Sequence, residues 1–445
     1  MHRESVLVSQ AGGALRGRLQ PPGDKSISHR AVILGALATG ESVIHHLLEG
    51  EDVLKTVAAF QAMGVTVRQD AQKVCRITGV GLDGLSEPMD VLDMGNSGTA
   101  MRLLTGLLAG QPFFSVLTGD GSLRNRPMGR VITPLGRMGA RILGRDGNRH
   151  APLAIHGTEL LGCPYVSPVA SAQIKTSLLL AGLLACGETS VTEPARSRDH
   201  TERMLTAFGV DVIQDGLTVA VTGRPHLRGI EMHVPGDISS AAFPLVAALL
   251  VPDSDVLLTG VGVNPTRTGL LDLLLAMGAR IELQNEREEG GEPVADLWVR
   301  HSQLKGIRVP PDVVPRAIDE LPVFALAAAC AEGETLLTGA EELRVKESDR
   351  ITAIALGLGR QGASIQELPD GMRIQGRPQG LVGGAAADAF QDHRVAMTLL
   401  VAGLVSQHPV TVTGQANVDT SFPGFVEAMF GLGARIGLQS REPVR

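Results

Sequence analysis

Charged and hydroxyl side chains stand directly in front of a long apolar run near the start of this 445-residue chain. The stretch DKSISHR at 24–30 leads into AVILGALA at 31–38, which predicts a helix buried on all sides whose N-terminus alone is accessible. Backbone N–H groups and the positive end of the helix dipole, joined by Lys25, Ser26 and Arg30, would bind a phosphate or a carboxylate. Ordinary capping with solvated charges explains one such helix equally well. The hypothesis therefore depends on whether the pattern recurs.

The pattern does recur, in front of later apolar runs and in the turns that follow strand-like segments. The residues concerned are Asn96, Ser97 and Thr99; Arg124, Arg126 and Arg130; Ser171, Gln173 and Lys175; Arg198; Arg267; Asp319 and Glu320; Lys346, Glu347 and Arg350; and Asp392, His393 and Arg394. If these ends face one another, they combine many cations, several helix N-termini and a few carboxylates. Such a site suits small substrates that carry phosphate and carboxylate groups. Taken singly, each stretch could be a plain loop, a solvated basic turn or a helix cap, so the coincidence carries the prediction.

Several other chemistries are disfavoured by motifs that the sequence lacks. There is no GxxxxGK[ST] phosphate loop, no GxSxG nucleophile turn and no metal-type spacing of His and Cys, so we predict no metal site. The four cysteines are far apart, which is typical of a reducing compartment, and we expect all of them in the core: Cys75, Cys163, Cys186 and Cys330.

Composition narrows the class of partner. The net charge is −7 and aromatic residues make up only 3% of the chain, which argues against a surface for nucleic acid or an anionic membrane. The longest apolar runs, such as LLLAGLLAC at 178–186, are half the length of a membrane span, and the first residues lack the apolar core of a signal peptide. We therefore expect a cytoplasmic protein that binds neither nucleic acid nor a membrane.

The elements that must position these residues repeat along the chain. A helix end followed by Gly, a small residue and a strand start recurs six times, at Gly64, Gly139, Gly209, Gly278, Gly362 and Gly433. Each Gly stands where a helix C-terminus needs a left-handed residue before the chain turns into a strand. An apolar helix with a polar front keeps the same phase, so the sequence predicts six α/β units of roughly 70 residues.

The two halves of the chain are similar in sequence, because the tripeptide Pro-Gly-Asp at 22–24 occurs again at 235–237. We therefore predict two globular domains of three units each, joined by two crossings. The lower domain comprises residues 1–22 and 236–445, and the upper domain comprises residues 23–235. The N-terminal strand at 6–19 would return to the lower domain, and the active site would lie in the cleft between the domains.

Eight stretches, in order along nearly the whole chain, resemble the family of 5-enolpyruvylshikimate-3-phosphate (EPSP) synthases, in its class II-like branch. They are PGDKSISHR, GNSGTAMR, NRPMGR, SAQIK, SRDHTE, IDELP, LRVKESDR and QDHRVAM. The resemblance implies an α/β fold of two globes, each of three βαβαββ units, like an inverse α/β barrel. It also implies the activity of a 3-phosphoshikimate 1-carboxyvinyltransferase: phosphoenolpyruvate and shikimate 3-phosphate give the enolpyruvyl ether and phosphate, on the pathway to chorismate and aromatic amino acids, without a cofactor. We expect a monomer, with phosphoenolpyruvate and shikimate 3-phosphate as its partners.

The resemblance also implies roles for individual residues. The implied catalytic residues are Asp319, Glu347 and Lys25. The implied ligands of shikimate 3-phosphate are Lys25, Ser26, Arg30, Ser171, Ala172, Gln173, Arg198, Asp319 and Lys346. The implied ligands of phosphoenolpyruvate are Lys25, Gly98, Arg126, Gln173, Arg350 and Arg394. Asp319 would take the proton of the attacking hydroxyl and Glu347 would move a proton at the enol methylene, which is acid–base chemistry suited to carboxylates. The family's inhibitor glyphosate would compete with phosphoenolpyruvate.

The chain departs from commoner relatives at Ala172, Leu103 and Thr420, where Ser, Pro and Lys are usual, and these differences bear on the phosphate-binding shell. Two other functions remain as alternatives. A UDP-N-acetylglucosamine enolpyruvyl transferase would share the six-unit fold but uses a loop cysteine as acid, whereas the loop here reads GDGSLRNRPMG. A non-catalytic anion-binding relative would have no need of Asp319, Glu347 and Lys25 together.

Overall fold

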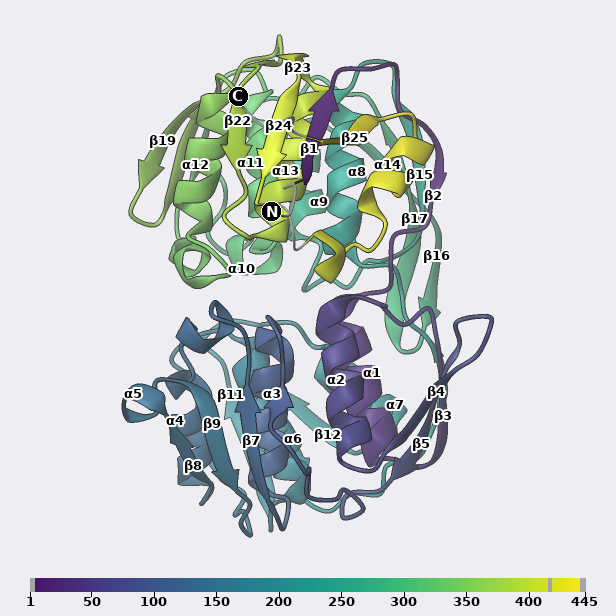
Figure 1. Ribbon diagram of the computed structural model, residues 1–445, viewed down its shortest axis with the longest axis vertical. Coiled ribbons are helices and arrows are strands. Elements are labelled where there is room, and N and C mark those ends of the chain that lie inside the picture. Colours follow the sequence, from purple (N-terminus) through teal and green to yellow (C-terminus); the bar gives the residue numbers. More distant parts are fainter. Residues whose placement is uncertain (1–4, 415–417, 441–445) are drawn as a thin grey trace. The chain divides into compact units, whose positions relative to one another are not determined.

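The computed structural model describes residues 5–414 and 418–440. The chain forms two compact units. Unit 1 contains the residues up to Pro22, Gly236–Arg287 and the residues from Pro293 onward; unit 2 contains Gly23–Pro235 together with the short segment Glu288–Glu292. Each unit is built from sheets and helices that recur in the same order (Figure 1).

Unit 2 contains three four-stranded sheets. Their strand orders are β14-β3-β5-β4, β6-β7-β9-β8 and β10-β11-β13-β12. The bounds are β3 (Thr39–His45), β4 (Thr66–Gln69), β5 (Cys75–Val80), β6 (Leu92–Asp93), β7 (Phe114–Thr118), β8 (Arg141–Gly144), β9 (His150–His156), β10 (Pro164–Val166), β11 (Glu188–Thr192), β12 (Val212–Asp215), β13 (Thr218–Thr222) and β14 (Glu231–His233). In each sheet the first strand pairs parallel with the second, and the remaining two pair antiparallel.

Unit 1 repeats this pattern with variations. Its larger sheets have the orders β16-β17-β15-β2, β22-β24-β1-β25 and β18-β20-β19, and β21 pairs with β23. The bounds are β1 (Ser5–Gln10), β2 (Arg16–Leu19), β15 (Asp255–Gly262), β16 (Arg280–Glu289), β17 (Glu292–Arg300), β18 (Glu334–Leu337), β19 (Ser364–Leu368), β20 (Gly371–Gln375), β21 (Leu381–Gly383), β22 (Ala386–Asp388), β23 (Ser406–His408), β24 (Val410–Thr413) and β25 (Arg435–Ser440). The segment predicted as one N-terminal strand is two strands: β1 lies between β24 and β25, and β2 pairs with β15 in another sheet.

Each unit buries three helices, one from each repeat. They are α1 (Lys25–Leu37), α3 (Gly98–Ala109) and α6 (Ala172–Leu184) in unit 2, and α8 (Ile238–Leu250), α11 (Leu321–Ala329) and α13 (His393–Leu404) in unit 1. The other helices are α2 (Glu51–Ala62), α4 (Gly129–Arg137), α5 (Arg145–Asn148), α7 (His200–Ala207), α9 (Gly269–Ala276), α10 (Val314–Ala317), α12 (Arg350–Arg360) and α14 (Phe425–Gly431), with single turns η1 (Leu123–Asn125), η2 (Glu341–Val345) and η3 (Val418–Thr420). The helices α2, α4, α7, α9, α12 and α14 end at the six repeated glycines, which all have positive φ between 89° and 98°, so the predicted repeat is confirmed.

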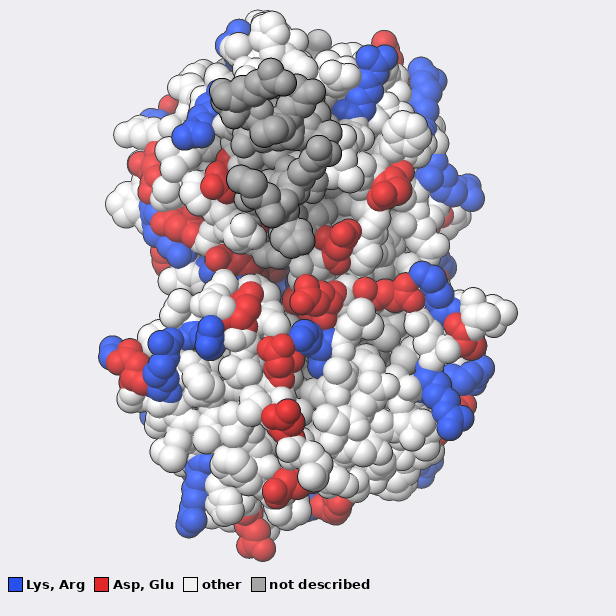
Figure 2. All heavy atoms as spheres, in the orientation of Figure 1, with Lys and Arg blue, Asp and Glu red and all other residues white. Residues whose placement is uncertain are grey.

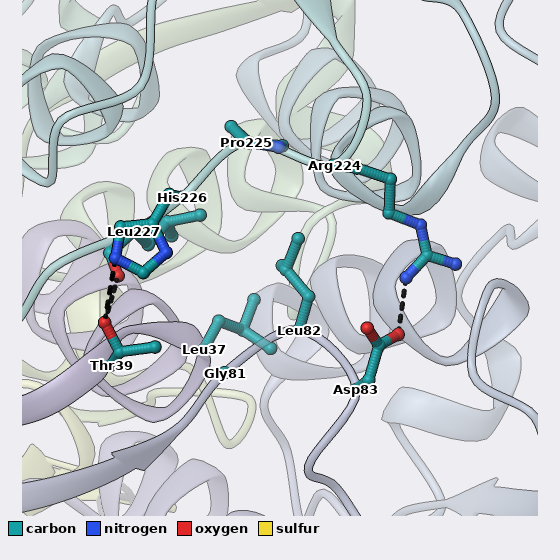
Figure 3. Close-up of a pocket in the computed structure, with 9 residues that line it drawn as sticks. All are labelled: Leu37, Thr39, Gly81, Leu82, Asp83, Arg224, Pro225, His226 and Leu227. Carbon is teal, nitrogen blue, oxygen red and sulfur yellow. Dashed lines mark hydrogen bonds and ion pairs between the residues drawn. The ribbon is translucent and has the colours of Figure 1, made fainter.

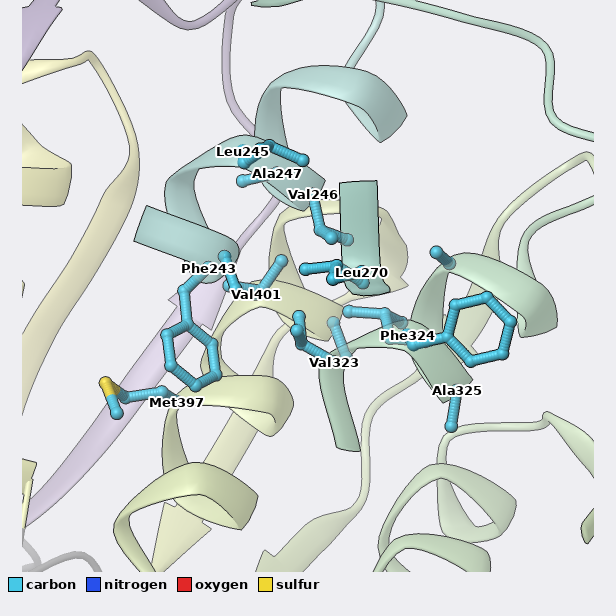
Figure 4. Close-up of a cluster of buried hydrophobic side chains, with 14 of the residues drawn as sticks. Phe243, Leu245, Val246, Ala247, Leu270, Val323, Phe324, Ala325, Met397 and Val401 are labelled. Atoms are coloured by element: carbon cyan, nitrogen blue, oxygen red, sulfur yellow. The ribbon is translucent and has the colours of Figure 1, made fainter. Parts of the chain in front are cut away.

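Small aliphatic side chains fill both cores, as the low aromatic content predicts. In unit 1, Phe243, Leu270 and Val323 bring α8, α9 and α11 together beside Val401 of α13 (Figure 4). Burying apolar area of this kind contributes about 25 cal/mol per Å² and holds the helix starts in fixed positions. Unit 2 has its own core around α1, α3 and α6.

One expectation about the core is wrong. Cys75 is buried and Cys163 and Cys330 are half-buried, but Cys186 is exposed. The reason is its position: α6 ends at the capping residue Ala185, and Cys186 and Gly187 form the surface turn that leads into β11. Hydrophobic character alone did not distinguish the last turn of the buried helix from the loop that follows.

The surface agrees with the charge balance of the sequence. Acidic and basic side chains are interspersed on the face shown in Figure 2. Within the part of the chain that the structure describes, no helix is both long and apolar enough to cross a membrane.

Candidate active-site residues

The front of α1 carries the first group of predicted residues. Asp24 caps the helix by accepting a hydrogen bond from the Ile27 N–H at 2.9 Å. Lys25 forms an ion pair with Asp52 of α2, with 2.9 Å between Nζ and Oδ2. The aliphatic residues behind this front are buried, so only the first turn of α1 offers polar groups. The predicted anion-binding end of α1 therefore exists as a capped, charged helix start.

Arg30 holds a fixed position beneath this first turn. Its Nε donates to Thr201 Oγ1 at 2.7 Å, its Nη2 to Thr176 Oγ1 at 2.8 Å and its Nη1 to the Ser26 carbonyl at 2.8 Å. Burial lowers the pKa of Arg30 to about 10, while the charges of Glu202 and Asp24 act in the opposite direction. Arg30 is thus a cation at neutral pH whose hydrogen-bond partners are neutral oxygens, an arrangement that leaves its charge for a substrate anion.

The start of α3 places Gly98 against Arg126. Ser97 caps this helix by accepting from the Ala100 N–H at 3.1 Å. Arg126 donates through Nη2 to Asn96 Oδ1, and a methyl group built on Gly98 would lie 2.9 Å from Arg126 Nη1. The glycine therefore leaves the space that the guanidinium occupies.

The start of α6 connects the other two helix starts of unit 2. Ser171 is its capping residue, and Ala172 is its first helical residue. Gln173 accepts a hydrogen bond from Arg102 Nη1 of α3 and donates to Thr99 Oγ1 at 3.0 Å. The bond from Arg30 to Thr176 joins α1 to α6. Unit 2 thereby brings the polar ends of all three buried helices together, with Arg198 in the half-buried loop before α7.

Unit 1 assembles a second group around Arg350, the first residue of α12. Arg350 contacts three carboxylates: Glu347 Oε2 at 2.6 Å, Asp392 Oδ2 at 2.8 Å and Asp319 Oδ1 at 3.3 Å. Burial alone would lower the pKa of Arg350, but the charges of Asp392, Glu347 and Asp319 outweigh it and raise the pKa above its ordinary value. Because the guanidinium is a rigid planar fork, it fixes the directions of all three carboxylates.

Lys346 and Arg394 complete this group. Lys346 Nζ lies 3.8 Å from Asp319 Oδ1, and Arg394 Nη1 donates to the Asp319 carbonyl at 3.0 Å. Burial lowers the pKa of Lys346, while the neighbouring charge of Asp319 opposes the shift. A lysine with a lowered pKa beside carboxylates gives up its proton more readily than a solvated lysine and is suited to proton transfer.

The predicted residues thus form one group in each unit. Unit 2 holds Lys25, Ser26, Arg30, Gly98, Arg126, Ser171, Ala172, Gln173 and Arg198, and unit 1 holds Asp319, Lys346, Glu347, Arg350 and Arg394. Leu103 is buried in α3, and Thr420 is buried in the single turn η3.

The sequence placed Asp392 among the charges at helix fronts, but it did not give the contacts that hold the implied substrate-binding residues in position. Asp392 caps α13 and bonds to Arg350 and to Ser348 Oγ, and Arg102 holds Gln173. A charged residue at a helix start signalled each of them, but the partner could not be read from spacing because Asp392 is 42 residues from Arg350.

The sequence did not predict a cluster formed by Asp199, His200 and Glu292, whose potential ligand atoms lie within 4.8 Å of one another. His200 Nδ1 and Glu292 Oε1 are 2.7 Å apart, and Arg203 Nε donates to Asp199 Oδ2 at 3.0 Å. The contact of His200 with Glu292, and the bond from Arg203 Nη1 to the Gly291 carbonyl at 3.0 Å, join the segment Glu288–Glu292 to α7, which agrees with its place in unit 2.

A pocket of about 200 Å³ lies away from these residues, beside the C-terminal end of α1 (Figure 3). Thr39 Oγ1 donates to the Leu227 carbonyl at 3.1 Å on one side, and Arg224 pairs with Asp83 on the other. The thirteen residues of α1 separate this pocket from Lys25 by roughly 20 Å of helix.

Comparisons with known proteins show the family of the chain. The family model for EPSP synthase (3-phosphoshikimate 1-carboxyvinyltransferase) matches residues 9–429. A 3-phosphoshikimate 1-carboxyvinyltransferase of Magnetococcus marinus is 62% identical over 98% of both chains, and one of Citrifermentans bemidjiense is 57% identical over 94% of this chain and 97% of the relative.

Solved structures show the same fold. EPSP synthase from Acinetobacter baumannii is 47% identical, with a TM-score of 0.88 over 98% of this chain and all of that chain. The enolpyruvyl transferase NikO from Streptomyces tendae, at 19% identity, has a TM-score of 0.79 over 99% of this chain and all of that chain and shows the fold alone. With its two units of repeated α/β sheets and a family match over nearly its whole length, the chain belongs to the EPSP synthase family.

Proposed function

We propose that this chain transfers the enolpyruvyl group of phosphoenolpyruvate to the 5-hydroxyl of shikimate 3-phosphate and releases phosphate. The observation that carries the proposal is that Arg350 forms ion pairs with Asp319 and Glu347, while Lys346 lies beside Asp319. Two carboxylates and a lysine in fixed positions are what an addition and elimination at an enol ether need. The reaction belongs to the route to chorismate and the aromatic amino acids.

The residues of unit 2 bind the two anions in this proposal. Shikimate 3-phosphate contacts Ser26, Arg30, Ser171, Ala172, Gln173 and Arg198, and phosphoenolpyruvate contacts Gly98, Arg126 and Gln173; Lys25 contacts both. Support comes from the three helix starts that converge there and from Arg30, whose neutral partners leave its charge for a phosphate.

The residues of unit 1 complete the binding and move the protons. Arg350 and Arg394 bind phosphoenolpyruvate, and Lys346 and Asp319 bind shikimate 3-phosphate. Asp319 takes the proton of the 5-hydroxyl as its oxygen bonds to C2 of phosphoenolpyruvate, and the methylene carbon C3 receives a proton from Glu347. The tetrahedral intermediate then loses phosphate from C2 as Asp319 gives its proton to the departing phosphate oxygen, and a C3 proton returns to Glu347, which restores the double bond.

Steady-state assays with the purified chain test this function. We expect phosphate release with shikimate 3-phosphate and phosphoenolpyruvate together, and none with either alone or with UDP-N-acetylglucosamine in place of shikimate 3-phosphate. Turnover with UDP-N-acetylglucosamine would favour the sibling activity. Binding of both anions without phosphate release would favour a non-catalytic relative. Sedimentation of the same preparation tests our further proposal that the working form is a monomer.

A further inference from the structure

A buried carboxylate outside the predicted site reaches two of its ligand-bearing segments. Glu193 directly follows β11 and is only 4% exposed. Its Oε1 accepts from the Ser171 N–H at 2.9 Å, and its Oε2 accepts from Ser197 Oγ at 2.8 Å. The same Oε2 lies 2.8 Å from Lys175 Nζ. Both oxygens of this side chain are thus occupied by protein donors.

The first contact fixes the start of α6. Ser171 caps this helix, and its own N–H lies outside the helical hydrogen-bond pattern, so it needs a partner from elsewhere. A carboxylate at a helix N-terminus is also favoured by the helix dipole. Glu193 therefore sets the direction of the backbone from which the Ser171 side chain and the first N–H groups of α6 project.

The second contact fixes the loop that carries Arg198. Ser197 immediately precedes Arg198, and the bond from Ser197 to Glu193 closes the loop between β11 and α7. Pro194, Ala195 and Arg196 are exposed, so this bond is a principal internal tie of the segment. One carboxylate thus determines the distance between the start of α6 and the Arg198 loop.

The negative charge of Glu193 would repel a phosphate bound at the neighbouring site, so a nearby cation is needed to reduce this repulsion. Lys175 offsets part of this charge, since its Nζ lies between Glu193 and Glu202 at 2.8 and 2.7 Å and all three side chains are at least 97% buried. Buried ion pairs of this kind add little net stability because removing the charges from water is costly, and their best-supported use is to specify one geometry.

We propose that Glu193, paired with Lys175, is a positioning residue that sets Ser171 and Arg198 at the spacing which shikimate 3-phosphate requires. The inference rests on the proposed function, in which these two residues bind that substrate. Glu193 does not touch the substrate and acts only through the two segments.

The test compares two matched substitutions, Glu193→Gln and Glu202→Gln. Each removes one of the two carboxylate partners of Lys175 at nearly equal distance and burial, but only Glu193 also holds Ser171 and Ser197. Titration calorimetry of shikimate 3-phosphate should show Kd raised roughly ten- to a hundredfold in Glu193→Gln, because hydrogen bonds to charged groups contribute at about that level. Kd should stay within about threefold in Glu202→Gln. Thermal unfolding of both variants would detect a general loss of structure.

Three further readouts separate positioning from other roles. At saturating shikimate 3-phosphate, kcat should change less than the KM for that substrate rises. If the charge of Glu193 were what mattered, its removal would tighten binding of the anion instead. Adding Glu193→Gln to Arg198→Ala should weaken binding less than it does in the wild type. Equal Kd values for wild type and Glu193→Gln would overturn the proposal, whereas a wild type that does not bind shikimate 3-phosphate would overturn the proposed function itself.

Discussion

The starts of the three buried helices carry different chemistry in the two units. In unit 2 the capping residues are Asp24, Ser97 and Ser171; in unit 1 they are Asp237, Glu320 and Asp392. The arginines differ in the same sense. Arg30 of unit 2 hydrogen-bonds to hydroxyl and carbonyl oxygens, whereas Arg350 of unit 1 is paired with three carboxylates.

The helix starts of the two units are therefore suited to different functions, although the repeats share one fold. In unit 2, Ser97 and Ser171 cap α3 and α6 with neutral hydroxyls and Arg30 has neutral hydrogen-bond partners, so these groups keep their attraction for an external anion, whereas Asp24 caps α1 with a carboxylate. A helix start capped by a carboxylate already has its dipole compensated, and Arg267 and Arg350 hold those carboxylates in place. Unit 2 is therefore suited to bind phosphate, and unit 1 is suited to orient proton-transfer groups. Substitutions in the two units should therefore affect binding, turnover and stability differently.

The largest effect is expected from Asp319→Asn in unit 1. The amide cannot accept the hydroxyl proton, so turnover should fall by roughly two to four orders of magnitude, the usual contribution of a positioned proton-transfer group. Binding of shikimate 3-phosphate should stay within a small factor, because unit 2 supplies most of its ligands. Phosphate-release kinetics and titration calorimetry measure the two quantities.

Asp312→Asn, at an exposed position just before α10, is the matched control and should leave both quantities unchanged. Turnover of Asp319→Asn within threefold of wild type would remove Asp319 as the base and weaken the division of work between the units.

The next effect compares stability in the two units. Arg350→Met leaves three carboxylates facing one another, and removing one partner of a buried ion pair typically costs about 3–5 kcal/mol. Arg30→Met leaves neutral groups, among them Thr176 and Thr201, whose hydroxyls already lie 2.5 Å apart, so the loss should be nearer 1–2 kcal/mol per unpaired group. Denaturant midpoints of the two variants provide the comparison, with Arg360→Met at the exposed end of α12 as control. Equal losses would contradict the claim that Arg350 is paired with carboxylates inside the fold whereas Arg30 is held by neutral oxygens.

The sequence predicted the repeats and the ligand-bearing ends better than it predicted their supports. The six glycines and the apolar runs follow local rules for helix ends and burial, so the α/β repeat could be read directly. The partner Asp392 for Arg350 comes from another repeat, and the partner Glu193 for Ser171 lies 22 residues away in the same repeat, so no local spacing rule reaches either one. The prediction that Cys186 lies in the core was wrong for a related reason. Its exposure depends on where the chain leaves the core after the end of α6.

A smaller effect is expected at Gly98 in the anion-binding unit. A methyl group there would lie 2.9 Å from Arg126 Nη1, and the guanidinium is the mobile end of its side chain, so the fold should tolerate Gly98→Ala. We expect wild type to be inhibited by glyphosate competitively with phosphoenolpyruvate. The substitution should raise the inhibition constant about ten- to a hundredfold, because one such clash costs roughly 1–3 kcal/mol and the shorter substrate has more room to shift.

Inhibition constants of wild type and Gly98→Ala, measured against phosphoenolpyruvate, provide the test. Gly136→Ala, where a methyl group meets nothing within 4 Å, is the control in the same unit. Equal constants in wild type and Gly98→Ala would mean that Gly98 does not determine access to the site beside Arg126.

The smallest effect concerns pH and follows from the burial of His29 beside the cations at the start of α1. His29 is fully buried in α1, with Nδ1 2.8 Å from Thr56 Oγ1. Burial, followed by the charges of Lys25 and Arg30, lowers the pKa of His29 well below the ordinary value of 6.5. As pH falls below 6.5, His29 of the unfolded chain binds a proton, whereas the buried His29 of the folded chain does not. The contribution of His29 to the free energy of unfolding is therefore fully present above pH 6.5 and is lost as the pH falls below that value.

His29→Gln removes this titration and should therefore flatten part of the pH dependence of unfolding. Between pH 7 and pH 5 the wild type should lose up to about 2 kcal/mol more than the variant, the limit set by protonation of one imidazole in the unfolded chain. Denaturant midpoints at the two pH values measure this difference, and His226→Gln, at an exposed position of unit 2, serves as control. If wild type and His29→Gln lost stability in parallel, the cations at the start of α1 would not control the protonation of their neighbours. The contrast between the two units would then have to rest on hydrogen-bond geometry rather than on charge.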